Sequence, residues 1–200
     1  NAPAAWETTT GSQDVTIAIV DMGVDYEAED LADQFGRDVG YDFVGGDSDP
    51  IPDIGEDHGM HVAGIAAATI DNGTGISGIA NARLLSCRAM ASWGGSGTDI
   101  ADAVQWAADQ GADLINLSLA SDKPATVLKD AIVYALGEGA LSICGAGNDD
   151  GKGDTDVTFP AAFDETIAVS AIDSQEQLWD YSHYGAAVDL TAPGVDILST

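Results

Sequence analysis

The sequence predicts an α/β protein of three layers, in which helices cover both faces of a mainly parallel β-sheet. Short apolar runs of strand length alternate with longer helical patterns, which is typical of βαβ units. Parallel strands joined in this way are buried on both faces. The chain has 200 residues, 45% of them hydrophobic, which is enough for one substantial core. It shows no internal repeat and no linker, so we expect one domain.

Six strands and three helices are expected. The strands are residues 15–21, 83–90, 113–119, 141–145, 166–171 and 187–191. The helices are residues 61–70, 98–110 and 124–136, and glycines or a proline mark several of their ends. Ligands of such sheets bind beyond the carboxyl ends of the strands. Asp21, Ser118 and Asn148 lie at or just after predicted strand ends, so we expect all three on one rim of the molecule.

The composition is strongly acidic, with 34 Asp and Glu residues against 6 Lys and Arg residues and a formal net charge of −28. Nucleic acids and anionic membranes are bound by cationic side chains, so this charge argues against both partners. Self-repulsion destabilises such a fold, and concentrated salt screens it. We interpret the charge as adaptation to a saline medium. A calcium-rich or merely acidic secreted protein is the alternative.

The two cysteines, Cys87 and Cys144, lie inside apolar strand-like runs, so we expect buried free thiols rather than a disulfide. No stretch is long and apolar enough to span a membrane. The sequence shows no signal peptide and no initiator Met. Residues 1–6 read as the inside of a longer chain, so the missing signal peptide says nothing about secretion.

Two segments carry residues typical of acid–base chemistry. Asp21 sits where a buried strand ends, and His58 sits at the start of a helical run of small residues. A carboxylate beside an imidazole fixes its tautomer and stabilises its charged form, so that the imidazole can take a proton from a serine hydroxyl. Either residue alone would more often be a turn residue or a helix-terminal residue. Together they predict two members of a catalytic triad.

A third segment, residues 145–148, ends a strand and leaves the amide side chain of Asn148 in a loop. An amide in this place can donate a hydrogen bond to a developing oxyanion, a contact whose loss costs about 3–4 kcal/mol. The alternative is a glycine-rich turn in which Asn adopts a left-handed conformation.

Five short motifs occur in order along the chain: DMGVD (21–25), HGMHVAG (58–64), SLAS (118–121), GAGN (145–148) and TAPG (191–194). In order and spacing they resemble subtilisin-like serine proteases, most closely the thermitase-like and halolysin-like members. The resemblance implies a subtilisin-like fold and a partial peptidase catalytic domain over residues 1–200, with the C-terminal part missing. The family's nucleophile serine lies in a Gly-Thr-Ser-Met-Ala-type helix start, expected after Thr200. We therefore expect residues 1–200 alone to be inactive.

The resemblance also implies roles for single residues. Asp21 would be the triad acid, His58 the general base and Asn148 the oxyanion-hole side chain, whereas His61 would be structural. Two segments would flank an extended peptide substrate as additional strands. These segments are Gly95, Ser96 and Gly97 on one side and Ser118, Leu119 and Ala120 on the other. A roomy, apolar pocket for the residue before the cut would be lined by Gly145, Ala146 and Gly147.

The resemblance further implies structural Ca²⁺. The family's calcium loop matches residues 70–76, where Asn72 would give a side-chain oxygen, Asp30 would add a carboxylate, and carbonyl oxygens would come from Ile70, Thr74 and Ile76. Such oxygen ligands suit the flexible coordination of calcium. The loop through Asp47, Asp49 and Asp53 resembles a second, weaker calcium site, for which a solvated acidic loop is the alternative.

The expected function is therefore a secreted, monomeric serine endopeptidase that acts on proteins or peptides. Three departures from the family pattern stand beside the expected site: Met22, Met60 and the pair Ala120–Ser121. They keep open the alternative of a pseudoprotease that binds peptides without cleaving them. A nucleotide-binding domain is a weaker alternative, because Gly151-Lys152 is followed by Gly153 rather than Ser or Thr.

Overall fold

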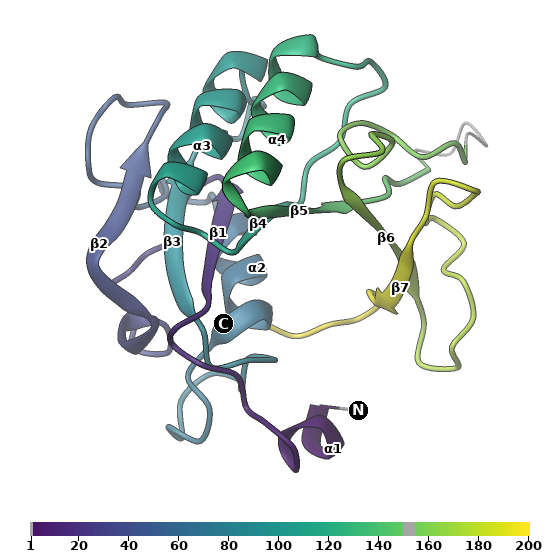
Figure 1. The fold of residues 1–200 in the computed structure, drawn as a ribbon. Coiled ribbons are helices and arrows are strands. Elements are labelled where there is room, and N and C mark those ends of the chain that lie inside the picture. Colours follow the sequence, from purple (N-terminus) through teal and green to yellow (C-terminus); the bar gives the residue numbers. More distant parts are fainter. Residues whose placement is uncertain (1, 150–154) are drawn as a thin grey trace.

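The computed structural model describes residues 2–149 and 155–200, and its frame is one seven-stranded sheet in which every pair of neighbouring strands is parallel (Figure 1). The strand order is β2-β3-β1-β4-β5-β6-β7. The strands are β1 (Thr16–Asp21), β2 (Phe35–Asp42), β3 (Arg83–Arg88), β4 (Leu114–Leu117), β5 (Leu141–Gly145), β6 (Ile167–Ile172) and β7 (Leu190–Pro193). The predicted mainly parallel sheet is confirmed.

Helices cover the sheet from both sides, as predicted. The α-helices are α1 (Ala2–Trp6), α2 (His58–Ala67), α3 (Gly97–Asp109) and α4 (Thr126–Glu138), with a 3₁₀ turn at Ala32–Gln34. Alternate residues of β1 divide the core into two clusters, since successive strand side chains point to opposite faces. Ala18 and Val20 pack in the cluster that includes α3 and α4, whereas Ile19 packs with α2. Figure 1 shows α3 and α4 side by side, apart from α2.

Sequence reasoning missed the edge strand β2. Its residues, FGRDVGYD, include three charged side chains and two glycines, so no apolar run marks it. The pairing with β3 shifts register between Phe35 and Gly40. Gly40 has a φ of 147°, and a Cβ there would lie 1.8 Å from the carbonyl oxygen of Ser86. Only glycine allows the two strands to approach this closely.

Several predicted boundaries were also displaced. Helix α2 begins at His58 and ends at Ala67, whereas residues 61–70 were expected. Its second residue is Gly59, a poor helix former, and the reason for that glycine is tertiary: a Cβ there would lie 2.2 Å from the carbonyl oxygen of Gly23. The last strand, expected over 187–191, is Leu190–Pro193, and α4 is shifted to Thr126–Glu138. Helix α1, which buries no residue, was not predicted.

The two thiols are free and buried, as expected. Burial raises the pKa of Cys87 and of Cys144, so both are neutral, apolar core groups at ordinary pH. No helix within residues 2–149 and 155–200 has the length and apolar character needed to cross a membrane.

Candidate active site

Asp21 and His58 form the centre of the candidate site. Asp21 is the last residue of β1 and is fully buried, and His58 is the first residue of α2, with 49% of its side chain exposed. The ring Nδ1 of His58 lies 2.8 Å from Oδ1 and 2.9 Å from Oδ2 of Asp21. The backbone N–H of Met22 also donates to Oδ1, at 2.7 Å. The structure therefore brings together the acid and base that the sequence predicted.

The surrounding backbone fixes both partners. The carbonyl oxygen of Asp21 accepts hydrogen bonds from the N–H groups of Ala89 and Met90, at 2.9 and 3.2 Å, just after β3. On the other side, Gly59 lies against the carbonyl of Gly23, so α2 begins directly over the turn that follows β1. A side chain at position 59 would collide with this carbonyl oxygen, 2.2 Å from its Cβ, and would also lie 3.3 Å from the Cβ of Asp21.

The contact with Asp21 controls the protonation of His58. Its hydrogen bond to Asp21 raises the pKa of His58, partial burial opposes the rise, and the charges of Asp21 and Asp57 add to it. A raised pKa makes the imidazole a stronger base than free histidine. The Nδ1 contact also favours the tautomer that keeps the lone pair on Nε2.

A cavity of about 430 Å³ opens beside His58, along the carboxyl ends of β4, β5, β6 and β7. Seven residues that were predicted to belong to the site border this cavity. They are Ser118, Leu119 and Ala120 of the second substrate segment, Gly145, Ala146 and Gly147 of the predicted pocket, and Asn148, the predicted oxyanion-hole residue. Strand-end residues far apart in the sequence thus meet at one rim. Asn148 is exposed and forms an isolated bridge with Ser182.

Gly147 requires its glycine. Its φ is 109°, and a Cβ there would lie 2.5 Å from Oγ1 of Thr158 and 2.6 Å from Nδ1 of His183. The backbone of the predicted oxyanion segment therefore packs closely against Thr158 and His183. By contrast, a Cβ at Gly145 would meet nothing within 4 Å. The pocket is roomy at Gly145 and tight at Gly147.

A second cavity, of about 670 Å³, lies on the other side of the segment 118–120 and also borders His58. Gly95 and Gly97 line it, whereas Ser96 borders a smaller cavity and caps α3 by accepting from the N–H of Thr98 at 3.2 Å. Gly97 is already the first residue of α3. Sequence reasoning missed several apolar lining residues, because nothing local marks them: Met90, Ile100, Leu128 and Phe159.

The residues expected to hold calcium lie together only in part. The Asp30 carboxylate accepts hydrogen bonds from Asn72 Nδ2 at 2.8 Å, from the Ile76 N–H at 2.9 Å and from Thr200 Oγ1 at 2.6 Å. Burial alone would raise the pKa of Asp30, and these three bonds outweigh it and lower the pKa. Thr74 donates its N–H to Asn72 Oδ1 at 2.9 Å. Among the described residues, no hydrogen bond joins Ile70 to Asp30 or Asn72.

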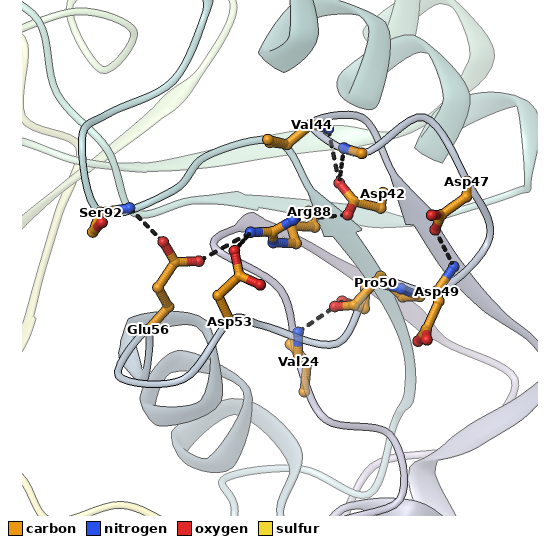
Figure 2. A network of polar contacts seen from close by, with 12 residues as sticks. Val24, Asp42, Val44, Asp47, Asp49, Pro50, Asp53, Glu56, Arg88 and Ser92 are labelled. Carbon is orange, nitrogen blue, oxygen red and sulfur yellow. Dashed lines mark hydrogen bonds and ion pairs between the residues drawn. The ribbon is translucent and has the colours of Figure 1, made fainter.

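The second expected calcium loop has a different arrangement. Asp53 points away from Asp47 and Asp49 and toward Arg88, whose Nη2 lies 2.7 Å from its Oδ2 (Figure 2). Asp49 donates its N–H to Asp47 Oδ1 at 2.9 Å. Across the part of the chain that the structure describes, no group of three His, Cys, Asp or Glu side chains is placed to hold a metal ion. Residues 151–153 of the nucleotide-binding alternative lie outside the described residues.

The motifs and this geometry agree with a comparison against protein families. The model described as "Subtilase family" matches residues 12–200. The chain belongs to the subtilase family. Two of its similar relatives are halolysin of Haloferax mediterranei, 54% identical over 202 residues, and the halolysin-like extracellular serine protease Nep of Natrialba magadii, 47% identical over 204 residues. Thermitase of Thermoactinomyces vulgaris is 42% identical over 202 residues.

Each of these alignments covers 100% of this subtilase chain. The chain covers 38% of halolysin, 37% of Nep and 69% of thermitase. It therefore spans less than two fifths of the length of the first two relatives. The relatives' names describe proteases, so the comparisons give no support to a peptide-binding pseudoprotease or to a nucleotide-binding domain.

Proposed function

We propose that this subtilase chain is part of the catalytic domain of a serine endopeptidase, in which Asp21 is the triad acid and His58 the general base. The observation that carries the proposal is the 2.8 Å contact between His58 Nδ1 and the fully buried Asp21 carboxylate, beside a cavity. This pair can accept a proton at Nε2, and the buried Asp21 carboxylate can stabilise the imidazolium that results. Family membership supports the reaction class.

The nucleophile is proposed to be a serine outside residues 1–200, in a Gly-Thr-Ser-type helix start. In the described residues, the hydrogen bonds of the His58 ring are those of Nδ1 to Asp21. Nε2 would take the proton of the serine hydroxyl as Oγ attacks the substrate carbonyl, and would then protonate the leaving amine. Water would then attack the acyl carbonyl as Nε2 takes its proton, and the bond to the serine Oγ would break as the imidazolium returns that proton to Oγ.

The two cavities suit an extended peptide. Ser118, Leu119 and Ala120 separate them and border both, so a substrate strand paired to this segment would place alternate side chains in either cavity. The residue before the cut would enter the pocket with Gly145, where the missing Cβ leaves room. The Asn148 amide would donate to the oxyanion together with a backbone N–H.

Calcium, a saline medium and an extracellular location are part of the proposal. Asp30, Asn72 and the carbonyl oxygens of residues 70, 74 and 76 would supply an all-oxygen donor set of the kind that Ca²⁺ prefers, after the Asn72 amide and the Ile76 N–H turn away from the Asp30 carboxylate that they now bind, and the ion would stabilise the loop rather than enter the reaction. The net charge of −28 and the likeness to halolysin and to the extracellular protease Nep support a saline, extracellular setting. We expect a monomer that binds protein or peptide substrates and neither nucleic acid nor membrane.

The test is proteolysis by the complete protein that contains this chain, assayed on casein in concentrated salt with calcium. The wild type should cleave casein, and His58→Ala should abolish cleavage. His61→Gln is the matched control, because the His61 ring contacts the carbonyl oxygen of Ile197 at 3.1 Å and belongs to the same helix. Cleavage that persists in His58→Ala would refute the proposal, and so would a folded wild type that cleaves nothing.

A further inference from the structure

Arg88 is the hub of a buried polar network beside the candidate site (Figure 2). It is the last residue of β3, and its side chain is only 7% exposed. Its Nη1 binds Asp42 at 2.8 Å, and its Nη2 binds Asp53 at 2.7 Å and Glu56 at 3.2 Å. One cation therefore faces three carboxylates, one at the end of β2 and two in the loop that enters α2.

The excess negative charge of the network is held by backbone donors. Asp42 Oδ1 accepts from the N–H groups of Val44 and Gly45, both at 2.8 Å, and Glu56 Oε1 accepts from the N–H of Ser92 at 2.6 Å. Burial alone would raise the pKa of Glu56, and the bonds from Ser92 and Arg88 outweigh it and lower the pKa. Both buried carboxylates, Asp42 and Glu56, are thus bound on each oxygen.

The two ends of the guanidinium serve different parts of the fold. Nη1 faces Asp42, the last residue of β2, whereas Nη2 faces the loop that enters α2. Glu56 stands two residues before His58, and the N–H of Glu56 itself bonds to the carbonyl of Asp53 at 3.0 Å. Nη2 therefore binds residues 53–56, the segment that leads directly into α2.

The Arg88 network also contacts the loop that leads to the second cavity. Ser92, whose N–H is bound by Glu56, lies three residues before Gly95, which borders the second cavity. The Arg88 Cδ also lies 3.2 Å from the position of a Cβ on Gly23, whose carbonyl contacts Gly59 of α2. Arg88 thus touches the turn after β1 and, through Glu56, the loop after β3.

We propose that Arg88, acting through Glu56, is a positioning residue that holds His58 over Asp21 and aligns the loop 92–95 with the substrate. The inference rests on the proposed function, since it assigns how the proposed base is aligned. Arg88 itself touches neither the His58 ring nor either cavity in the described residues. Misalignment of a catalytic group by about 1 Å is enough to cost about 10²-fold in rate.

The experiment compares Glu56→Gln with Asp42→Asn in the complete protein. Both variants remove one buried carboxylate from Arg88, but only Glu56 lies on the loop that enters α2. Glu56→Gln should lower kcat by about 10- to 100-fold, whereas Asp42→Asn should leave kcat near the wild-type value. Arg88→Lys should restore part of the kcat that Arg88→Met loses, because it keeps the charge without the two-sided fork.

A second readout separates positioning from general loss of stability. The pKa of His58, followed through its ring Cε1–H by NMR, is raised mainly by its contact with Asp21, with a further contribution from Asp57. A fall of that pKa in Glu56→Gln, with no fall in Asp42→Asn, would therefore report that His58 has moved from Asp21. Unchanged kcat and unchanged His58 pKa in Glu56→Gln would overturn the inference. If the wild type is inactive, the proposed function fails and the His58 pKa alone decides the positioning.

Discussion

Asp21 and Arg88 are neighbours in the sheet, as the register partners at the last positions of β1 and β3. Their side chains nevertheless enter separate networks. Asp21 binds the ring of His58 at 2.8 Å, and Arg88 binds Glu56, two residues earlier in the chain, at 3.2 Å. The ends of two adjacent strands thus contact the start of α2. Asp21 of β1 contacts it through the His58 ring, and Arg88 of β3 contacts the loop that leads into it.

Replacement of Asp21 with Asn should lower kcat of the complete protein by about 10⁴-fold. Asn is nearly the same size as Asp, but its amide offers one acceptor and a donor, so it favours the wrong tautomer of His58. Cleavage of a chromogenic peptide measures the loss, and near-UV circular dichroism checks the fold. A variant that keeps kcat within tenfold of the wild type would show that Asp21 does not act on His58.

The pH profile follows from the raised pKa of His58. The base must be neutral, so kcat/KM should rise with pH through a midpoint above the ordinary histidine value of 6.5. The same shift makes protonated His58 stabilise the fold, an effect fully present below the unfolded-state pKa and lost as pH rises through the folded-state value. Rate measurements between pH 5 and 9 locate the midpoint. A midpoint below 6.5 would contradict the account.

Gly147→Ala should destabilise the protein by about 1–3 kcal/mol. The residue has a φ of 109°, and the new Cβ would lie 2.5 Å from Thr158 Oγ1. Gly137→Ala in α4 is the matched control: its Cβ would meet nothing within 4 Å, and alanine should stabilise the helix by about 0.5–1 kcal/mol. Chemical denaturation measures both. Equal stability of the two variants would show that position 147 is not constrained.

Removal of calcium should lower the Tm of the wild type. A ligand at 100 times its Kd stabilises the folded state by about 2.7 kcal/mol. Asp30→Asn should have a lower Tm in calcium and respond little to a chelator, because it loses the carboxylate of the proposed site. Asp33→Asn is the control, since Asp33 is exposed and close by in sequence. Calorimetry with calcium and with chelator decides, and a wild-type Tm that ignores the chelator would remove calcium from the account.

The sequence allowed the central pair to be predicted because local patterns mark both residues. An apolar run ends at Asp21 and a small-residue helix begins near His58, and parallel strands gather such ends on one rim. Local sequence patterns of this kind do not predict contacts between residues far apart in the chain. The link from Arg88 to Glu56 joins residues 32 positions apart, and no local pattern announces it. The edge strand β2 escaped for a related reason, because its exposed positions carry no apolar run.

The second cavity shows the same limit. A place beside the substrate was implied for Gly95 by the family resemblance, whereas Phe159 reaches the cavity from a distant loop. Ser121 and Phe159 are joined by two backbone hydrogen bonds, of 2.8 and 2.9 Å, which bring that loop beside the segment 118–120. Backbone pairing of this kind depends on the whole fold and not on residue type.

The most direct test of the central claim is labelling of the complete protein with a fluorophosphonate, followed by mass spectrometry of the modified peptide. The probe reacts with a serine that a neighbouring base has activated. We expect one modified serine, outside residues 1–200, and loss of the label in both His58→Ala and Asp21→Asn. A label on a serine within residues 1–200, or one that persists in His58→Ala, would contradict the assignment of Asp21 and His58 as the acid and base.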